Sequence, residues 1–341
     1  LYGAIHTHDN NGDATILVEK NSNEGIVSAS GNYIGGIAGF AKGEFHSTGY
    51  NYGYREHLAT IKITSCKNIS EVSGTDYVGG ILGFGEKYIA ELSFSTNSAD
   101  ITGNLYVGGY AGYSLNSDMR NLQNNNRITG KAWIGGIAGY AGKLEQCENS
   151  GVISNMGYYL DDNNNALSYV GGIAGYATSA NNCTNNSNIS VTDGGNYIGG
   201  IVGYLHATRS DDDTLFSENK NIGEISGESC IGGIFGSFIV QDSGNSYIMT
   251  IKNNSNEAII SASGDYVGGV IGFVKGEFHS TGYNAGYKEH LAKVKITNCK
   301  NISEVSGNNY VGGIFGYGKE HISELSFCTN SADITGNLYV G

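Results

Sequence analysis

A short apolar stretch rich in glycine recurs along the chain. It reads YIGGIAGF from Tyr33 to Phe40 and returns in related form, for example as YVGGIAGY from Tyr169. The first glycine of each pair lies at Gly35, Gly79, Gly108, Gly135, Gly171, Gly199, Gly232, Gly268, Gly312 and Gly341. Recurrence every few tens of residues is typical of repeat proteins, in which each repeat packs against its neighbours.

A second, longer period is superimposed on the first. Successive glycine pairs lie 27 to 44 residues apart, and the whole series of steps starts again after 233 residues. The segment KGEFHSTGYN accordingly occurs at both Lys42 and Lys275. Leu1 aligns with Ile234, so both ends of the chain fall inside a repeat. We therefore expect residues 1–341 to be one continuous segment of a longer repetitive chain.

An asparagine precedes each glycine pair, and a Val or Ile lies four residues after that asparagine, as in Asn23 and Val27. These asparagines are Asn23, Asn68, Asn97, Asn124, Asn149, Asn185, Asn221, Asn256, Asn301 and Asn330. The spacing inside this phrase is constant although the length of the repeat changes. The phrase is therefore structural, and the extra residues belong to loops.

This pattern predicts an all-β fold, a β-solenoid of about ten coils of 27–44 residues with a 233-residue super-repeat. Stacked coils place equivalent residues about 4.8 Å apart, so the asparagines would form a ladder of side-chain amides. Asn also tolerates the left-handed backbone that tight corners need. Val and Ile would fill the interior, and glycine would supply either a positive φ or a close backbone approach.

The glycine-rich stretch leaves two arrangements open. In an extended strand, Tyr33 and Ile37 would lie on one face and Ile34 and Phe40 on the other, so both faces would be apolar. Either the outer face is covered, by a long loop or a neighbouring solenoid, or the glycine pair breaks the strand and directs both sets inward.

Composition narrows the class of protein. The formal charge of −13 argues against nucleic acid and anionic membranes as partners. The chain has 54 glycines, 24 tyrosines and no proline, which excludes collagen and favours strands. No apolar run approaches the roughly 18 residues of a membrane-spanning helix.

The repeated YVGGIAGY stretch, together with the phrase CENSGVI from Cys147, resembles the GLUG motif. This Gly-rich repeat occurs in large secreted and surface proteins of bacteria, including the non-catalytic regions of IgA-cleaving metallopeptidases. The resemblance implies a stalk or display scaffold at the cell surface. It implies no peptidase activity, because the segments around His57 and His290 lack the second histidine of an H-E-x-x-H zinc motif.

Candidate chemistry is sparse. His6 and His8 have no counterparts in the second block, and the acidic stretches Asp9–Asp13 and Ser210–Asp213 lack the pattern of a calcium loop. No G-x-S-x-G nucleophile motif occurs, and the carboxylates are scattered rather than gathered in one cleft. We predict no catalytic residue, no metal site and no cofactor.

Five cysteines occupy one slot two residues before a ladder asparagine: Cys66, Cys147, Cys183, Cys299 and Cys328. Other repeats place Ser, Asn or Leu in this slot, which predicts a small, half-buried stacking position. Disulfides between successive coils, Cys147 with Cys183 or Cys299 with Cys328, would be strained by parallel side chains. Packing of free thiols is therefore favoured.

Two long loops, residues 41–60 and 274–293, are copies of each other and are rich in aromatic residues. Their candidate contact residues are Phe45, His46, Tyr50, Tyr52, Tyr54, Phe278, His279, Tyr283 and Tyr287. Such loops suit adaptable binding surfaces. They would cover the solenoid itself, contact another copy of the chain or bind a foreign ligand.

We expect a secreted or cell-surface structural shaft, a segment of a fibre, stalk or adhesin whose coils stack into a rigid rod. Its expected partners are copies of itself, end to end or side by side, because exposed strand edges favour self-association. The alternative function is an adhesin module that binds glycans or host proteins through the aromatic loops. A β-helical enzyme acting on carbohydrates is a weaker third hypothesis.

Overall fold

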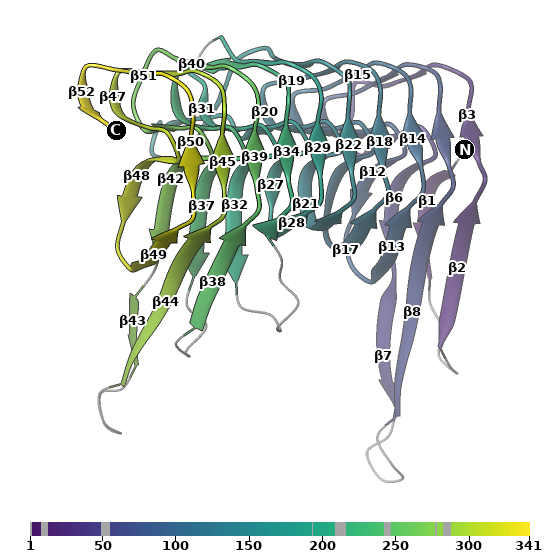
Figure 1. Cartoon of the computed structure of the whole chain (residues 1–341). Helices are drawn as coiled ribbons and strands as arrows, with labels where there is room; N and C mark the ends of the chain where they lie inside the picture. Colours follow the sequence, from purple (N-terminus) through teal and green to yellow (C-terminus); the bar gives the residue numbers. More distant parts are fainter. Residues whose placement is uncertain are drawn as a thin grey trace.

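The computed structural model describes residues 2–7, 13–48, 55–192, 194–208, 216–241, 247–276, 278–281 and 288–341. These residues form strands, turns and bends and contain no α-helix. Figure 1 shows the strands side by side in rows that run from the N-terminal to the C-terminal end of the molecule. The predicted all-β solenoid is confirmed, and each coil passes through four sheets in turn.

The ladder asparagines end the strands of one sheet, called here the asparagine sheet. Its ten strands are β3 (Ser22–Asn23), β9 (Lys67–Asn68), β14 (Thr96–Asn97), β18 (Gln123–Asn124), β22 (Glu148–Asn149), β29 (Thr184–Asn185), β34 (Lys220–Asn221), β39 (Ser255–Asn256), β45 (Lys300–Asn301) and β50 (Thr329–Asn330).

The Val and Ile that follow begin the strands of the valine sheet. Its ten strands are β4 (Val27–Ser28), β10 (Val72–Ser73), β15 (Ile101–Thr102), β19 (Ile128–Gly130), β23 (Ile153–Asn155), β30 (Ile189–Ser190), β35 (Ile225–Gly227), β40 (Ile260–Ala262), β46 (Val305–Ser306) and β51 (Ile334–Thr335).

The first glycine of the pair ends nearly every strand of the glycine sheet. This sheet consists of β5 (Ile34–Gly35), β11 (Asp76–Gly79), β16 (Leu105–Gly108), β20 (Ala132–Gly135), β26 (Val170–Gly171), β31 (Asn196–Gly199), β36 (Ser229–Gly232), β41 (Val267–Gly268), β47 (Asn309–Gly312) and β52 (Leu338–Val340).

The fourth sheet, called the long sheet, begins just after the glycine pair. Its main strands are β1 (Tyr2–His6), β6 (Ala38–Lys42), β12 (Leu82–Gly85), β17 (Ala111–Arg120), β21 (Ala138–Glu145), β27 (Ala174–Ala177), β32 (Val202–Thr208), β37 (Phe235–Gln241), β42 (Ile271–Gly276) and β48 (Phe315–Lys319). Strands β2 (Ala14–Glu19), β7 (Glu44–Thr48), β8 (Arg55–Thr64), β13 (Ile89–Ser93) and β28 (Ser179–Asn181) join it.

The remaining strands belong to two smaller sheets. One contains β33 (Phe216–Ser217), β38 (Tyr247–Lys252), β43 (Phe278–Thr281), β44 (Lys288–Thr297) and β49 (Ile322–Ser326). The other is the antiparallel pair β24 (Tyr159–Leu160) and β25 (Ala166–Leu167).

Neighbouring coils pair in parallel and in register. Asn68 lies beside Asn97, and Val72 lies beside Ile101. Because equivalent residues meet in each sheet, an identical side chain forms a continuous column along the stack.

The asparagine column is a hydrogen-bonded ladder. Each side-chain Nδ2 donates to Oδ1 of the asparagine in the next coil, in nine consecutive bonds of 2.7–2.9 Å from Asn23 to Asn330. The second Nδ2 proton of most of these amides is donated to a backbone carbonyl two residues further on, as from Asn124 to Asn126 at 2.8 Å. The amides are therefore satisfied although Asn68 to Asn301 are buried.

The glycine pair breaks the strand, as the second of the two arrangements proposed, but it does not direct both sets inward. Ile37 is buried, whereas Tyr33 is exposed and Phe40 is only partly buried. In the second coil, Val78 packs into one hydrophobic core with Val72, whereas Ile81 and Leu82 pack into another. Between the two cores, the second glycine of the pair faces the asparagine ladder, and we call this part of the coil the waist. A Cβ on Gly80 would lie 2.7 Å from Asn97 Oδ1. Close approach, rather than positive φ, is the reason for glycine here.

Left-handed backbone occurs at other positions than expected. The ladder asparagines do not adopt it, whereas nine residues of the column that begins with Tyr33 do, with φ of 52° to 64°. A second left-handed column lies three residues before each ladder asparagine, as at Ser65 and Asn121. The asparagines contribute through their amides, because the backbone turn has already been made before them.

We predict that Asn124→Ala lowers the free energy of unfolding by about 2–4 kcal/mol, because Asn97 Nδ2 and Asn149 Oδ1 would each lose a buried partner. Chemical denaturation measures this change. Asn125→Ala is the matched control, since the Asn125 side chain is exposed, and it should change stability by less than about 0.5 kcal/mol. Equal losses in the two variants would contradict the role given to the ladder.

We also predict that Gly136→Ala disrupts folding far more than Gly25→Ala. A methyl group on Gly136 would overlap the Gly172 carbonyl oxygen and the Asn149 side chain, whereas nothing lies near Gly25. The overlap forces neighbouring coils apart at the waist, which we expect to cost more than about 3 kcal/mol. Soluble yield and denaturation midpoints provide the measurement, and a Gly136→Ala protein as stable as the parent would refute this packing.

Candidate functional site

Two columns of aromatic rings run along the outside of the stack, on either side of the glycine pair. The first contains Tyr33, Tyr77, Tyr106, Trp133, Tyr169, Tyr197, Tyr266, Tyr310 and Tyr339, and the second contains Phe40, Phe84, Tyr113, Tyr140, Tyr176, Tyr204, Phe273 and Tyr317. Cys230 and Ser237 replace the aromatic residue in both columns of the same coil. Equivalent aromatic residues of successive coils thus form two columns of stacked rings.

The faces of most of these rings are already occupied. Tyr77 and Tyr106 stack at 4.6 Å, and Tyr140 and Tyr176 stack at 4.0 Å. The columns also touch each other edge to face, as between Tyr77 and Phe84 at 5.1 Å. Rings stacked in this way present edges and hydroxyl groups to the solvent. A sugar therefore finds no free ring face where both neighbours in the column are aromatic, as at Tyr106 and Tyr140.

The cysteine slot faces the larger core. Cys66, Cys147, Cys183 and Cys299 are buried, which corrects the expectation of a half-buried position, and only Cys328 is partly exposed. All six cysteines are free thiols. Burial raises the pKa of the Cys66 thiol, so this thiol fills space rather than reacts. Cys328 differs, because a hydrogen bond with the Cys299 side chain lowers the pKa of the Cys328 thiol. Polar residues in the same slot accept backbone hydrogen bonds, as Ser95 Oγ does from Cys66 N at 3.0 Å.

The two long loops form antiparallel hairpins, β7 with β8 and β43 with β44. Phe45 stacks on Tyr88 at 6.3 Å. The predicted contact residues Tyr50, Tyr52, Tyr54, Tyr283 and Tyr287 lie outside the described residues, as do the side chains of His46, Phe278 and His279. The acidic stretches Asp9–Asp13 and Ser210–Asp213 also fall largely outside them.

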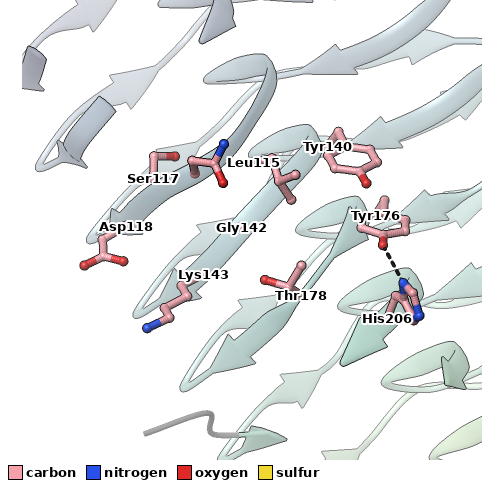
Figure 2. Close-up of a pocket in the computed structure, with 10 residues that line it drawn as sticks. Leu115, Ser117, Asp118, Tyr140, Gly142, Lys143, Tyr176, Thr178 and His206 are labelled. Atoms are coloured by element: carbon pink, nitrogen blue, oxygen red, sulfur yellow. Dashed lines mark hydrogen bonds between the residues drawn. The ribbon is translucent and has the colours of Figure 1, made fainter. Parts of the chain in front are cut away.

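A cavity of about 380 Å³ opens on the long sheet between the projecting hairpins. It is formed by β17, β21, β27 and β32, in the middle of the stack (Figure 1). Figure 2 shows Tyr140, Tyr176 and His206 on one side and Asp118 and Lys143 on the other. Leu115, Asn116, Ser117, Gly142 and Thr178 complete the lining.

An insertion in one strand makes a lip over the cavity. Ser114 pairs with Ala141 and Asp118 with Lys143, so three residues of β17 face the single residue Gly142. The backbone of Leu115 then lies directly against Gly142, where any side chain would overlap the Leu115 carbonyl. Glycine at 142 thus allows the lip to bend over the next coil.

Hydrogen bonds order the opposite wall. The Tyr176 hydroxyl lies 3.0 Å from His206 Nδ1, and Tyr176 also interacts with the Tyr140 hydroxyl. Burial raises the pKa of Tyr140 and, more strongly, that of Tyr176. Both phenols are therefore protonated at neutral pH and can donate as well as accept hydrogen bonds.

The charges near the cavity compensate one another. Asp118 pairs with Arg120 at 3.2 Å. Lys143 is exposed and neighbours Asp118 across the two strands, and Glu145 neighbours Arg120. Two acidic and two basic side chains therefore alternate along this edge. The arrangement can supply hydrogen bonds in several directions without a strong net field.

Sequence reasoning missed this cavity, although a signal was present. The stretch from the glycine pair to the next ladder asparagine is short in two consecutive coils, Gly135 to Asn149 and Gly171 to Asn185. The stretches from Gly35 to Asn68 and from Gly268 to Asn301 are more than twice as long. Short coils between long ones leave a depression on the face where the lengths differ.

No family model, no curated protein and no solved structure matches this chain. The resemblance to GLUG repeats stays a prediction. Among the described residues, no three His, Cys, Asp or Glu side chains come together in a group that could hold a metal ion. Within the same residues there is no helix with the length and hydrophobicity to cross a bilayer.

We predict that Tyr77, Tyr113 and Tyr197 of the aromatic columns ionise late. Burial raises the pKa of Tyr197 to about 12 and also raises those of Tyr77 and Tyr113. A pKa raised on folding stabilises the folded state fully below the ordinary value of about 10, and this stabilisation is lost as pH rises through the folded-state pKa. Phenolate absorbance of the folded protein should therefore lag behind that of the denatured protein. Identical titration curves would contradict the burial of the columns.

Proposed function

We propose that the chain is a structural shaft, a rod of stacked coils that spaces or displays what is attached to it. The observation that supports this role is the unbroken asparagine ladder, whose nine hydrogen bonds link all ten coils. A joint between coils would break the ladder and both cores, so the stack resists bending over its whole length.

The aromatic columns support the same proposal. Most of their ring faces are used inside the chain, in contacts between successive coils. Such contacts add about 0.5–1.5 kcal/mol per pair beyond the area that they bury. They therefore stiffen the rod rather than form a platform for ligands.

We further propose an extracellular location, on the basis of the GLUG resemblance, and copies of the same chain as partners. The strands at the two ends of each sheet, such as β3 and β50, pair on one side only. In the segment taken by itself, the backbone groups on the other side of these strands can pair with a strand of another copy. A second proposal is that the aromatic loops bind glycans or host proteins. Most of the side chains that would do so lie outside the described residues.

The shaft is tested by joining one, two and three copies of the 233-residue block and measuring the maximum dimension by small-angle X-ray scattering. We expect each block of seven coils to add about 34 Å, since each coil adds one strand spacing of about 4.8 Å. A dilution series separates this growth from end-to-end association. A dimension that rises much less than in proportion to block number would show hinged units and exclude a rigid shaft.

A further inference from the structure

The cavity on the long sheet is a separate feature that stacking of the coils does not require. The sheet would remain continuous if Leu115–Ser117 were a single residue, as the corresponding position is at Gly142 and at Thr178 in the next two coils. The insertion instead creates a lip, while the Gly142 carbonyl accepts a hydrogen bond from Thr178 N at 3.2 Å and closes the floor. Its volume of about 380 Å³ lies within the range of small-molecule sites.

The lining is rich in groups that both donate and accept hydrogen bonds. Tyr140, Tyr176 and Thr178 contribute hydroxyl groups, and Asn116 contributes an amide. Leu115 is the one aliphatic side chain among the lining residues. Tyr140, Tyr176 and His206 already bond one another, but each phenol oxygen can take part in a further hydrogen bond. A hydrophobic ligand would leave that capacity unused, and the lining therefore disfavours it.

Charge disfavours an ionic ligand as well. Asp118 pairs with Arg120 at 3.2 Å, and Lys143 lies next to Asp118 in the sheet register. An anion attracted to Lys143 would be repelled by Asp118 nearby. A cation attracted to Asp118 would likewise be repelled by Lys143. A ligand that has many hydroxyl groups and no charge satisfies both constraints.

We propose that this cavity binds a neutral saccharide unit through its hydroxyl groups. The sugar would lie against the ring edges and hydroxyls of Tyr140 and Tyr176, since the two rings occupy each other's faces at 4.0 Å. Thr178 on the floor and Asp118 and Lys143 on the far side would contact further hydroxyls (Figure 2). Binding is weak, in about the millimolar range, because the site is open and relies on hydrogen bonds.

The experiment is a glycan array of neutral oligosaccharides with terminal glucose, galactose, mannose or N-acetylglucosamine, beside sialylated and sulfated counterparts. The best neutral probe is then titrated in solution, with binding followed by NMR. The variants Tyr176→Phe and Thr178→Val each remove one hydroxyl and keep the shape. Tyr113→Phe, in the same column but outside the cavity, and Thr129→Val, on the valine sheet, are the matched controls.

We expect the two cavity variants to weaken binding of the neutral probe about three- to tenfold each, as loss of one hydrogen bond predicts. The two controls should bind like the parent chain. Circular dichroism and denaturation midpoints show that all four variants fold. The proposal is overturned if no neutral probe binds at millimolar concentration, if only acidic glycans bind, or if cavity and control variants behave alike.

Discussion

The hydrogen bond from one buried asparagine amide to the next is the interaction on which this structure depends. An amide can donate to its neighbour above and accept from its neighbour below only when coils lie one strand spacing apart and in register. A coil displaced by one residue would bury an unsatisfied amide, at a cost of about 1–3 kcal/mol for each lost partner. The ladder therefore selects one register for every sheet of the coil.

The other columns follow from that register. Because the second glycine of each pair faces the ladder at the waist, the chain can turn there and fill two cores instead of one. The residues before and after the turn then emerge on the outside, where Tyr77 and Phe84 begin their contact. The two cores, the waist and the aromatic columns thus all follow from the turn at the glycine pair and from the ladder asparagine that it faces.

Most of the variation between coils lies in the long sheet, although the antiparallel pair β24–β25 is an insertion between the valine and glycine sheets. Between the second aromatic column and the left-handed corner before the next ladder asparagine, no column requires a fixed number of residues, so insertions project outward without disturbing the stack. Hairpins such as β7–β8 arise where the insertion is long, and the cavity beneath Leu115 arises where two short coils lie between longer ones. Shaft and binding site can therefore coexist, because they use different parts of the same coil.

The solenoid, the number of coils and the members of the asparagine ladder could be predicted from the sequence, because a spacing that stays constant while the repeat length changes is typical of residues that stack in register. The sequence left open whether the glycine pair continues or breaks the strand, because periodicity does not state where backbone atoms approach each other. It also did not place the left-handed corners at Tyr33 and Ser65. The cavity belongs wholly to the tertiary structure: Tyr176, His206 and Asp118 come from three different coils, and only their relative heights along the stack bring them around one space.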